Sequence, residues 1–421
     1  GAHRDLHSFP TRRSSDLDLL PEECRQYRFI VKEAMKVARC YGFEEISTPI
    51  FEFSGVFHRL GETSDVVSKE TYTFQDRGGG DLTLRPEGTA GIVRAVISHG
   101  LAQHAPLKFS YARPMFRYER PQKGRYRQFD QIGVELIGVA KPLADIEVIA
   151  MAHQILKNLG VDESVKLNIN TLGDTESREN YKKALLNYLK PFRPKLSLES
   201  QDRLDRNPLR ILDSKSEQDE MIIKEAPVYS DYLNETSKTF FNDVCKGLEI
   251  LDISYKVNTR LVRGLDYYSH TTFELITDVL GAQSTVIAGG RYDNLVEMMG
   301  GPRLPGVGWG AGVDRLALLR PIIPLEQTPI AMIPLGDEAE KACFKLTQEL
   351  RDKGIFVDIG YHGNLSKRLK RADKLKATYA IIIGEDEMRA QEALLRDFKT
   401  GAQEKVPFEK LVDKLVKVQL A

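Results

Sequence analysis

Cationic and aromatic side chains gather in one stretch of the chain, from Phe116 to Phe129. Several arginines, a lysine and a glutamate lie there between aromatic rings. Apolar and aromatic residues at both ends predict strands, and Pro121 and Gly124 indicate a turn between them. Guanidinium groups on such a platform match phosphate oxygens, and the ring of Phe129 could stack on a base. These residue types suggest a site for a polyanion beside a planar ring, with a solvated charged hairpin as the plain alternative.

The next segment runs from Gln131 to Gly138, and its polar and apolar residues alternate. Gln131, Gly133 and Glu135 are separated by apolar residues. Because successive side chains of a strand point to opposite faces, the polar groups would share one face. A strand of this kind can carry a substrate pocket, which favours the binding interpretation over the solvated hairpin.

The composition fits an enzyme and excludes several other classes. With 421 residues the chain is long enough for two or three domains. Its formal net charge is zero, so contacts to nucleic acid would have to come from local patches. The four cysteines lie far apart, and the histidines form no ligand-like cluster, which argues against a disulfide framework or structural zinc and fits a reducing cytoplasm. No apolar run approaches the ~18 residues of a membrane span, so a soluble, cytosolic protein is expected.

The N-terminal part of the chain predicts a long helix that leads into an edge strand. Residues 1–17 lack any periodicity and are interpreted as a cloning or assembly scar outside the fold. Pro21 indicates the start of an amphipathic helix, whose apolar residues recur at three- and four-residue spacing until Gly42. A strand is expected over residues 43–50, and its Pro49 is typical of a sheet edge.

Polar residues also lie where a strand is predicted to give way to a helix. Two strands are expected over residues 71–74 and 82–85, and Glu87, Gly88 and Thr89 follow at the start of a helix. Ligand groups often cluster at such junctions, although Glu and Thr near a helix start are more often capping residues.

The composition divides the chain into a first domain over residues 18–320 and a second over residues 330–421, joined by a linker at 321–329. Within the first domain, about residues 175–249 are charged and helical in character and are interpreted as a helical insertion. Short apolar strands alternate with helices in the second domain, which predicts a small α/β domain with a largely parallel sheet.

Two glycine-rich segments lie at residues 288–293 and 305–316. The first predicts a strand, a turn and a helix passing through Gly289 and Gly290, and the second leads into a helix that carries Arg315. Gly-x-Gly-x-x-Gly does not occur in the right phase, and Gly-Lys-Ser/Thr occurs nowhere. A Rossmann or Walker nucleotide site is therefore not expected.

These segments resemble the motifs of class II aminoacyl-tRNA synthetases. Residues 116–129 with Gln131 and Glu135 are similar to motif 2 in its histidyl form, and the Pro-bearing edge strand and residues 305–316 are similar to motifs 1 and 3. Residues 261–268 and 288–293 resemble the two signatures peculiar to histidyl-tRNA synthetases. The resemblance runs from about residue 18 to the C-terminus. One departure is that the Arg-Gly pair that normally precedes Asp-x-Leu-Pro is missing before residues 18–21.

The resemblance implies a fold and a reaction. The fold would be α+β, an antiparallel sheet flanked by helices, with a helical insertion that contacts the tRNA acceptor arm and a C-terminal anticodon-binding domain. The reaction would be that of a histidine–tRNA ligase, in which ATP with Mg²⁺ activates L-histidine and tRNA(His) receives it. The glycines of motif 3 would let strand and helix approach closely. A homodimer without membrane association is expected, with no metal held by a protein-only cluster and no editing domain.

The resemblance also assigns the site residues. The catalytic arginines would be Arg117, Arg263 and Arg315. Histidine would be bound by Glu87, Gly88, Thr89, Arg117, Gln131, Glu135, Arg263, Tyr267, Tyr268 and Tyr292. ATP would be bound by Arg117, Glu119, Arg125, Phe129 and Arg315. Glu135 would accept a hydrogen bond from one ring nitrogen of histidine, and Tyr268 would serve the other.

Contacts to tRNA are expected from two places. Gln122 and Arg125 lie in the motif 2 loop, which would meet the acceptor end. Lys367, Arg368 and Arg371 belong to a basic helix of the C-terminal domain, whose plain interpretation is a solvated face and whose implied role is contact with phosphates.

Three alternatives remain open. Similar chains serve as catalytically silent, histidine-sensing regulatory subunits of ATP phosphoribosyltransferase, but those typically lack the C-terminal domain and the catalytic arginines, which this chain keeps. A pure RNA-binding scaffold would not require Glu87, Gln131, Glu135 and Tyr268 together. A different class II synthetase would share the three general motifs but not the two histidyl signatures.

Overall fold

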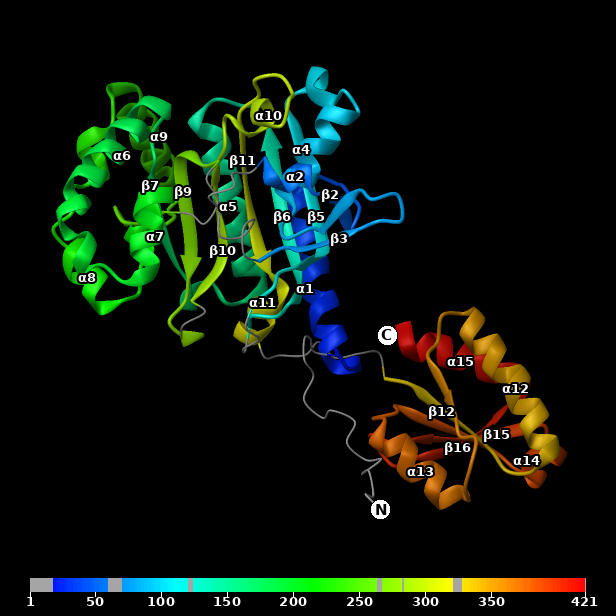
Figure 1. Cartoon of the computed structure of the whole chain (residues 1–421). Helices are drawn as coiled ribbons and strands as arrows, with labels where there is room; N and C mark the ends of the chain where they lie inside the picture. The colour runs from blue at the N-terminus through cyan, green and yellow to red at the C-terminus, as the bar shows by residue number, and fades with distance from the viewer. Residues whose placement is uncertain are drawn as a thin grey trace, which may run out of the picture. The chain divides into compact units, whose positions relative to one another are not determined.

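The computed structural model (Figure 1) describes residues 18–59, 70–119, 124–262, 267–281, 284–320 and 328–420. The chain forms two compact units, Gly1–Pro324 and Leu325–Ala421. Among the described residues, none of the helices combines the length and the hydropathy that a membrane span needs.

The described part of the first unit is built on an eight-stranded sheet with the order β1-β5-β6-β11-β10-β9-β7-β8. All ladders from β5 to β7 are antiparallel, and only the outer pairs β1/β5 and β7/β8 are parallel. This arrangement confirms the predicted α+β class with an antiparallel sheet. The strands are β1 (Glu44–Glu45), β5 (Leu107–Phe116), β6 (Gln128–Ile137), β7 (Lys166–Thr171), β8 (Tyr255–Val257), β9 (Ser269–Ile276), β10 (Thr285–Arg291) and β11 (Gly306–Gly312).

One face of this sheet is covered by α1 (Pro21–Cys40), α5 (Pro142–Leu159) and α11 (Val313–Leu319), as Figure 1 shows. Helix α1 begins at a proline in its first turn and ends before Gly42, whose φ is +79°. Its apolar residues pack into one core with Ile132, Val134 and Leu136 of β6. The alternation predicted for β6 is therefore confirmed, because its apolar residues face these helices and its polar residues face the other way.

A smaller sheet with the order β2-β4-β3 lies in the same unit, formed by β2 (Phe51–Phe53), β3 (Tyr72–Gln75) and β4 (Asp81–Leu84). The strand expected over residues 43–50 is much shorter, because only Glu44–Glu45 pair with β5. The backbone carbonyls of Thr48 and Pro49 instead accept hydrogen bonds from the guanidinium of Arg85, at 2.8 and 3.3 Å. Pro49 has no N–H to offer a neighbouring strand, so pairing stops before it.

The helical insertion lies between β7 and β8. Three of its helices begin at a residue whose side chain accepts a hydrogen bond from a backbone N–H of the first turn, Asp174, Ser197 and Asn234. The α-helices of the insertion are α6 (Thr175–Leu189), α7 (Leu198–Arg206), α8 (Glu217–Ile223) and α9 (Glu235–Ile250). The remaining helices in the described part of the unit are α2 (Gly55–His58), α4 (Thr89–Ser98), α10 (Leu295–Met298) and the short 3-10 helices η1 (Leu101–His104), η2 (Asp162–Ser164), η3 (Lys190–Lys195), η4 (Pro208–Asp213) and η5 (Tyr229–Tyr232).

The second unit is a five-stranded sheet with the order β13-β12-β14-β15-β16, covered by helices on both faces. The prediction of a largely parallel sheet is wrong, because β14, β15 and β16 pair antiparallel and only the two ladders of β12 are parallel. The elements are β12 (Ile330–Pro334), α12 (Asp337–Asp352), β13 (Val357–Ile359), α13 (Leu365–Lys374), β14 (Tyr379–Ile383), α14 (Glu385–Ala390), β15 (Glu392–Asp397), β16 (Gln403–Pro407) and α15 (Phe408–Leu420).

Candidate active site

A cavity of about 310 Å³ opens over the central strands of the large sheet. The cavity is lined by the polar face of β6 and by parts of β9, β10 and β11. Most of the residues expected to bind histidine or ATP line it, namely Glu87, Thr89, Arg117, Glu119, Arg125, Phe129, Gln131, Tyr267, Tyr268, Tyr292 and Arg315. Segments far apart in the sequence therefore meet at one site.

Three arginines, Arg117, Arg125 and Arg315, line the cavity. The Nε atom of Arg117 donates to the carbonyl of Pro86 at 2.9 Å, and its guanidinium lies 5.4 Å from the centre of the Phe129 ring. Arg315 donates to the carbonyls of Gly124 and Thr285 at 3.1 and 2.6 Å. These bonds to backbone oxygens hold the guanidinium groups in place without cancelling their charge.

The third of these arginines, Arg125, is paired with the carboxylate of Glu119. Burial lowers the pKa of Arg315, and the positive charges of Arg117 and Arg125 lower it further. Since an arginine stays charged in proteins, a polyanion such as a triphosphate would relieve the mutual repulsion of these groups.

Next to the cavity lies Glu135, which is fully buried at 1% exposure. Its carboxylate accepts a hydrogen bond from the Thr89 hydroxyl at 2.6 Å and another from the Tyr292 hydroxyl. Glu135 therefore lies directly behind two residues that line the cavity, rather than lining it itself. A carboxylate has about four acceptor positions, so it can still accept a third hydrogen bond from a ligand.

Burial raises the pKa of Glu135 from 4.5 to about 8. The hydrogen bonds from Thr89 and Tyr292 lower it by less than burial raises it, and the nearby Glu87 raises it further. The side chain is therefore mainly protonated at neutral pH. A perturbed carboxyl group beside a cavity is a common mark of a functional site.

Glu87 has two roles at the start of α4. Its carboxylate accepts hydrogen bonds from the backbone N–H groups of Thr89 and Ala90 at 2.8 and 2.7 Å, so it is a capping residue. It also lines the cavity, where burial raises its pKa and Arg117 lowers it. The capping and ligand-binding interpretations of this junction are thus compatible. Gly88 does not line the cavity, but a Cβ there would lie 2.4 Å from the Tyr111 ring.

Sequence reasoning missed Tyr111 of β5, which lines the cavity and donates to the Gln131 side chain at 3.2 Å. The strand pairing places Tyr111 opposite Gly133, where an added Cβ would lie 2.3 Å from the tyrosine ring. The signal that could have found it is its position on an alternating strand that pairs with β6. Glu274 and Asp314 also line the cavity and were not predicted.

The glycines of β11 make room for side chains of its neighbours. A Cβ at Gly308 would lie 2.1 Å from a carboxylate oxygen of Glu135, and one at Gly310 would lie 2.6 Å from the amide of Gln131. At Gly306 it would lie 2.1 Å from the ring of Tyr292. The turn expected at Gly289 and Gly290 is wrong, because both residues are paired inside strand β10. There they allow close contact with β11 and with Tyr268.

Some expected residues lie elsewhere. Arg263 and Gln122 lie outside the described residues. In the second unit, Arg371 pairs with Asp358 at 2.9 Å, and Arg368 donates to the carbonyls of Gly363 and Pro334. The side chains of α13 that were expected to contact phosphates are thus partly engaged within the domain.

Comparisons with known proteins cover nearly the whole chain. The family described as Histidyl-tRNA synthetase matches residues 17–316, and the one described as Anticodon binding domain matches residues 329–418. A histidine–tRNA ligase of Rhodospirillum rubrum is 54% identical over 92% of this chain and 94% of its own. One of Gluconobacter oxydans is 51% identical over 93% of this chain and 94% of its own. The solved structure of apo S. aureus histidyl-tRNA synthetase matches with a TM-score of 0.81 at 35% identity, covering 96% of this chain and 99% of that one.

Proposed function

The chain belongs to the histidyl-tRNA synthetase family, and we propose that the cavity over its central sheet is where the family's reaction takes place. As a histidine–tRNA ligase, it activates L-histidine with ATP to histidyl-adenylate and pyrophosphate and then transfers histidine to the 3′ end of tRNA(His). One observation carries the assignment of the cavity: Arg117, Arg125 and Arg315 line the same space as Thr89 and Tyr292, whose hydroxyls donate to Glu135.

In the activation step, a carboxylate oxygen of histidine attacks the α-phosphorus of ATP, and the bond to pyrophosphate breaks. Both reactants are anions, so their repulsion is the main obstacle. We assign Arg117 to the α-phosphate and Arg315 to the γ-phosphate, beside an adenine that stacks on Phe129. Fixed donors of this kind typically contribute about 10²–10³ in rate. Arg263, assigned to the α-phosphate and the substrate carboxylate, lies outside the described residues.

In the transfer step, the terminal ribose hydroxyl of tRNA attacks the carbonyl carbon of histidyl-adenylate, and AMP leaves. We assign the motif 2 loop, with Gln122 and Arg125, to the acceptor end of the tRNA. The second unit is an anticodon-binding domain, and we assign Lys367, Arg368 and Arg371 to its phosphate contacts. A phosphate that reaches Arg371 would have to compete with Asp358.

Specificity for histidine follows from hydrogen bonds to the imidazole ring. Glu135 is assigned as the acceptor for one ring N–H, and Tyr268 serves the other ring nitrogen, with Gln131 and Tyr292 completing the pocket. Glu87 and Thr89 are assigned to the α-amino group. A site that hydrogen-bonds a polar substrate group can reject analogues that lack the group by roughly 10⁴–10⁵, which makes an editing step unnecessary.

Mg²⁺ fits the site as a partner of ATP. Within the described residues, no group of three or more His, Cys, Asp or Glu side chains could hold a metal ion alone. Among the carboxylates that line the cavity, we assign Glu119 and Glu274 to the metal ion. Such a donor set suits Mg²⁺, which keeps several waters and is usually held by one or two carboxylates together with substrate phosphates. When bound, it would offset the negative charge of the phosphates.

We further propose a homodimer that works in the cytoplasm, where charged tRNA is used. Large apolar side chains lie exposed together on the small sheet, with Phe53 67% exposed and Phe51 packed edge-on against Phe74 at 6.4 Å. This apolar face adjoins the segment that resembles the dimer-forming motif 1. A second copy of the chain is therefore its proposed occupant.

The test is ATP–pyrophosphate exchange with each of the twenty amino acids. We expect stimulation by histidine alone, followed by histidine attachment to tRNA(His) when the tRNA is added. Exchange without any amino-acid dependence, or stimulation by another amino acid, would refute the assignment. The same assay separates the alternative of a silent regulatory subunit, which the ligase relatives do not favour and which would show no exchange.

A further inference from the structure

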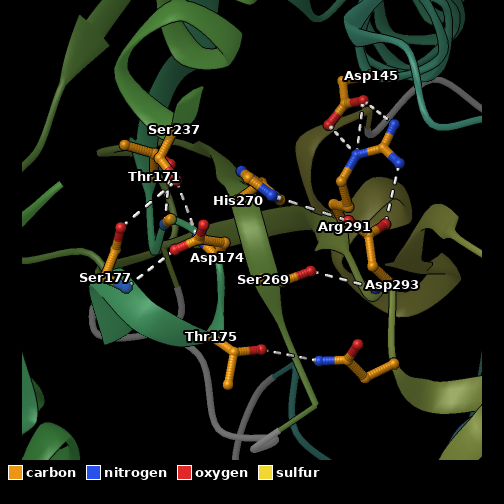
Figure 2. Close-up of polar contacts among 12 residues, drawn as sticks. Asp145, Thr171, Asp174, Thr175, Ser177, Ser237, Ser269, His270, Arg291 and Asp293 are labelled. Carbon is orange, nitrogen blue, oxygen red and sulfur yellow. Dashed lines mark hydrogen bonds and ion pairs between the residues drawn. The ribbon is translucent and has the colours of Figure 1, made fainter. Parts of the chain in front are cut away.

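Figure 2 shows one of the places where the helical insertion meets the catalytic sheet. Asp174, at the start of α6, receives a hydrogen bond from the Ser177 N–H at 2.9 Å, and its own N–H donates to the Ser237 hydroxyl of α9 at 3.0 Å. His270 of β9 lies between this cap and the pair formed by Arg291 and Asp293. The backbone of His270 donates to the carbonyl of Gly173 just before α6, at 2.7 Å. The start of the insertion is thereby joined to β9.

An aromatic ring of the insertion takes part in this junction. Phe240 of α9 packs against the imidazole of His270 with ring centres 4.7 Å apart and planes inclined by 32°. The guanidinium of Arg291 lies 5.0 Å from the centre of the same phenyl ring. Burial lowers the pKa of His270, so the imidazole is neutral at pH 7 and does not repel Arg291. Phe240 of the insertion thus contacts both His270 of β9 and Arg291 of β10.

Arg291 is directly connected to the amino-acid end of the cavity. Its fully buried side chain is paired with Asp145 of α5 and donates to the carbonyl of Val139 at 2.9 Å. The next residue in the chain is Tyr292, whose hydroxyl donates to Glu135. A shift of Arg291 would therefore move the tyrosine that holds the buried carboxylate.

A second contact leads from the insertion to the same end of the cavity. Arg178 of α6 donates from Nη1 to the backbone carbonyl of Tyr268 at 3.2 Å. Tyr268 lines the cavity and packs against Tyr267 with ring centres 4.7 Å apart. Arg315 is held at different residues, since it bonds to the carbonyls of Gly124 and of Thr285, which is the first residue of β10, whereas Arg291 is the last.

We propose that the helical insertion is a structural part of the histidine pocket, with Phe240 and Arg178 as positioning residues for Tyr292 and Tyr268. The inference rests on the proposed function, because it assigns these tyrosines to the amino-acid substrate. It predicts that disturbing the two contacts weakens histidine binding and leaves ATP binding unchanged. A module that served only to contact tRNA would affect neither substrate in the absence of tRNA.

The test uses ATP–pyrophosphate exchange by the full chain without tRNA, with histidine and ATP varied separately. Phe240→Leu keeps an apolar side chain but removes the ring, and Arg178→Met removes the donor to Tyr268. We expect each to raise KM for histidine about tenfold, which corresponds to about 1.4 kcal/mol, with KM for ATP changed less than about twofold. Phe240→Tyr keeps the ring and should restore a KM near that of the wild type.

Phe241→Leu is the matched control, since Phe241 is the next residue of α9 and packs against the apolar core. It should leave both KM values unchanged. Unaltered KM for histidine in Phe240→Leu and Arg178→Met would overturn the inference, as would an equal rise for histidine and ATP. If Phe240→Leu fails to fold, Arg178→Met, at a half-buried position of α6, tests the inference by itself. A wild-type chain without histidine-dependent exchange would instead refute the proposed function.

Discussion

Replacing Glu135 with glutamine should change the pH dependence of stability. Burial raises the pKa of this carboxyl from 4.5 to about 8 in the folded chain. Between these values the folded protein binds more protons than the unfolded one, so its stability falls as pH rises through the window. At about 1.4 kcal/mol per pH unit, the loss approaches about 5 kcal/mol by pH 8. Glutamine has the same shape and does not titrate, so Glu135→Gln should escape this loss.

The unfolding of the first unit can be followed directly, because the single tryptophan of the chain, Trp309, is buried in β11. Its fluorescence should report a melting temperature that falls between pH 6 and pH 8.5 more steeply in the wild type than in Glu135→Gln. The exposed Glu44, changed in the same way, is the control and should follow the wild type. Parallel pH profiles for the wild type and Glu135→Gln would show that the pKa of the Glu135 carboxyl is not raised in the folded chain.

The same variant tests substrate recognition. A hydrogen bond to a charged group typically contributes about 1.5–3 kcal/mol, so its loss should raise KM for histidine by roughly 10- to 150-fold at pH 8.5. KM for ATP should stay unchanged, because Glu135 is not among the residues assigned to ATP. Pyrophosphate exchange measures both values. An unchanged KM for histidine would remove Glu135 from the recognition role.

Three further substitutions test other parts of the site. Arg315→Ala should lower the exchange rate by about 10²-fold through loss of a fixed cation, and an unchanged rate at saturating histidine would contradict that role. Gly308→Ala should abolish histidine-dependent exchange, because its Cβ would lie 2.3 Å from the carbonyl oxygen of Val134, whereas Gly55→Ala meets nothing within 4 Å and should be tolerated. Phe53→Asp should convert the dimer to a monomer in light scattering after gel filtration, and a wild type that is already monomeric would contradict the proposed interface.

Local patterns in the sequence predicted the elements that carry the site. The alternation after residue 130 gave the correct two faces of β6, because one face of this strand packs on helices and the other on a polar cavity. The proline and acidic residues at the start of α1 and the glycine after it gave its bounds, since these signals act within one turn of the helix.

Other features depended on neighbours that a single sequence does not reveal. Gly289 and Gly290 have the composition of a turn, yet both are paired in β10 because β11 and Tyr268 approach them closely. Tyr111 belongs to the cavity only because its strand pairs with β6 opposite Gly133. In the second unit, the antiparallel hairpin of β15 and β16 carries polar residues and offered no apolar run to predict it.

The glycines of β11 show how the sequence encodes the pocket across two strands. Glycine recurs at every second position from Gly306 to Gly312, so one face of this strand has no side chains, while the residues between them are apolar and buried. Strand β11 pairs with β6, and Gly308 lies directly opposite Glu135. A side chain there would occupy the space of the carboxylate, so the buried acid can exist only because its neighbour is glycine. The proposed recognition of the imidazole therefore depends as much on the absence of a side chain at Gly308 of β11 as on the carboxylate of Glu135.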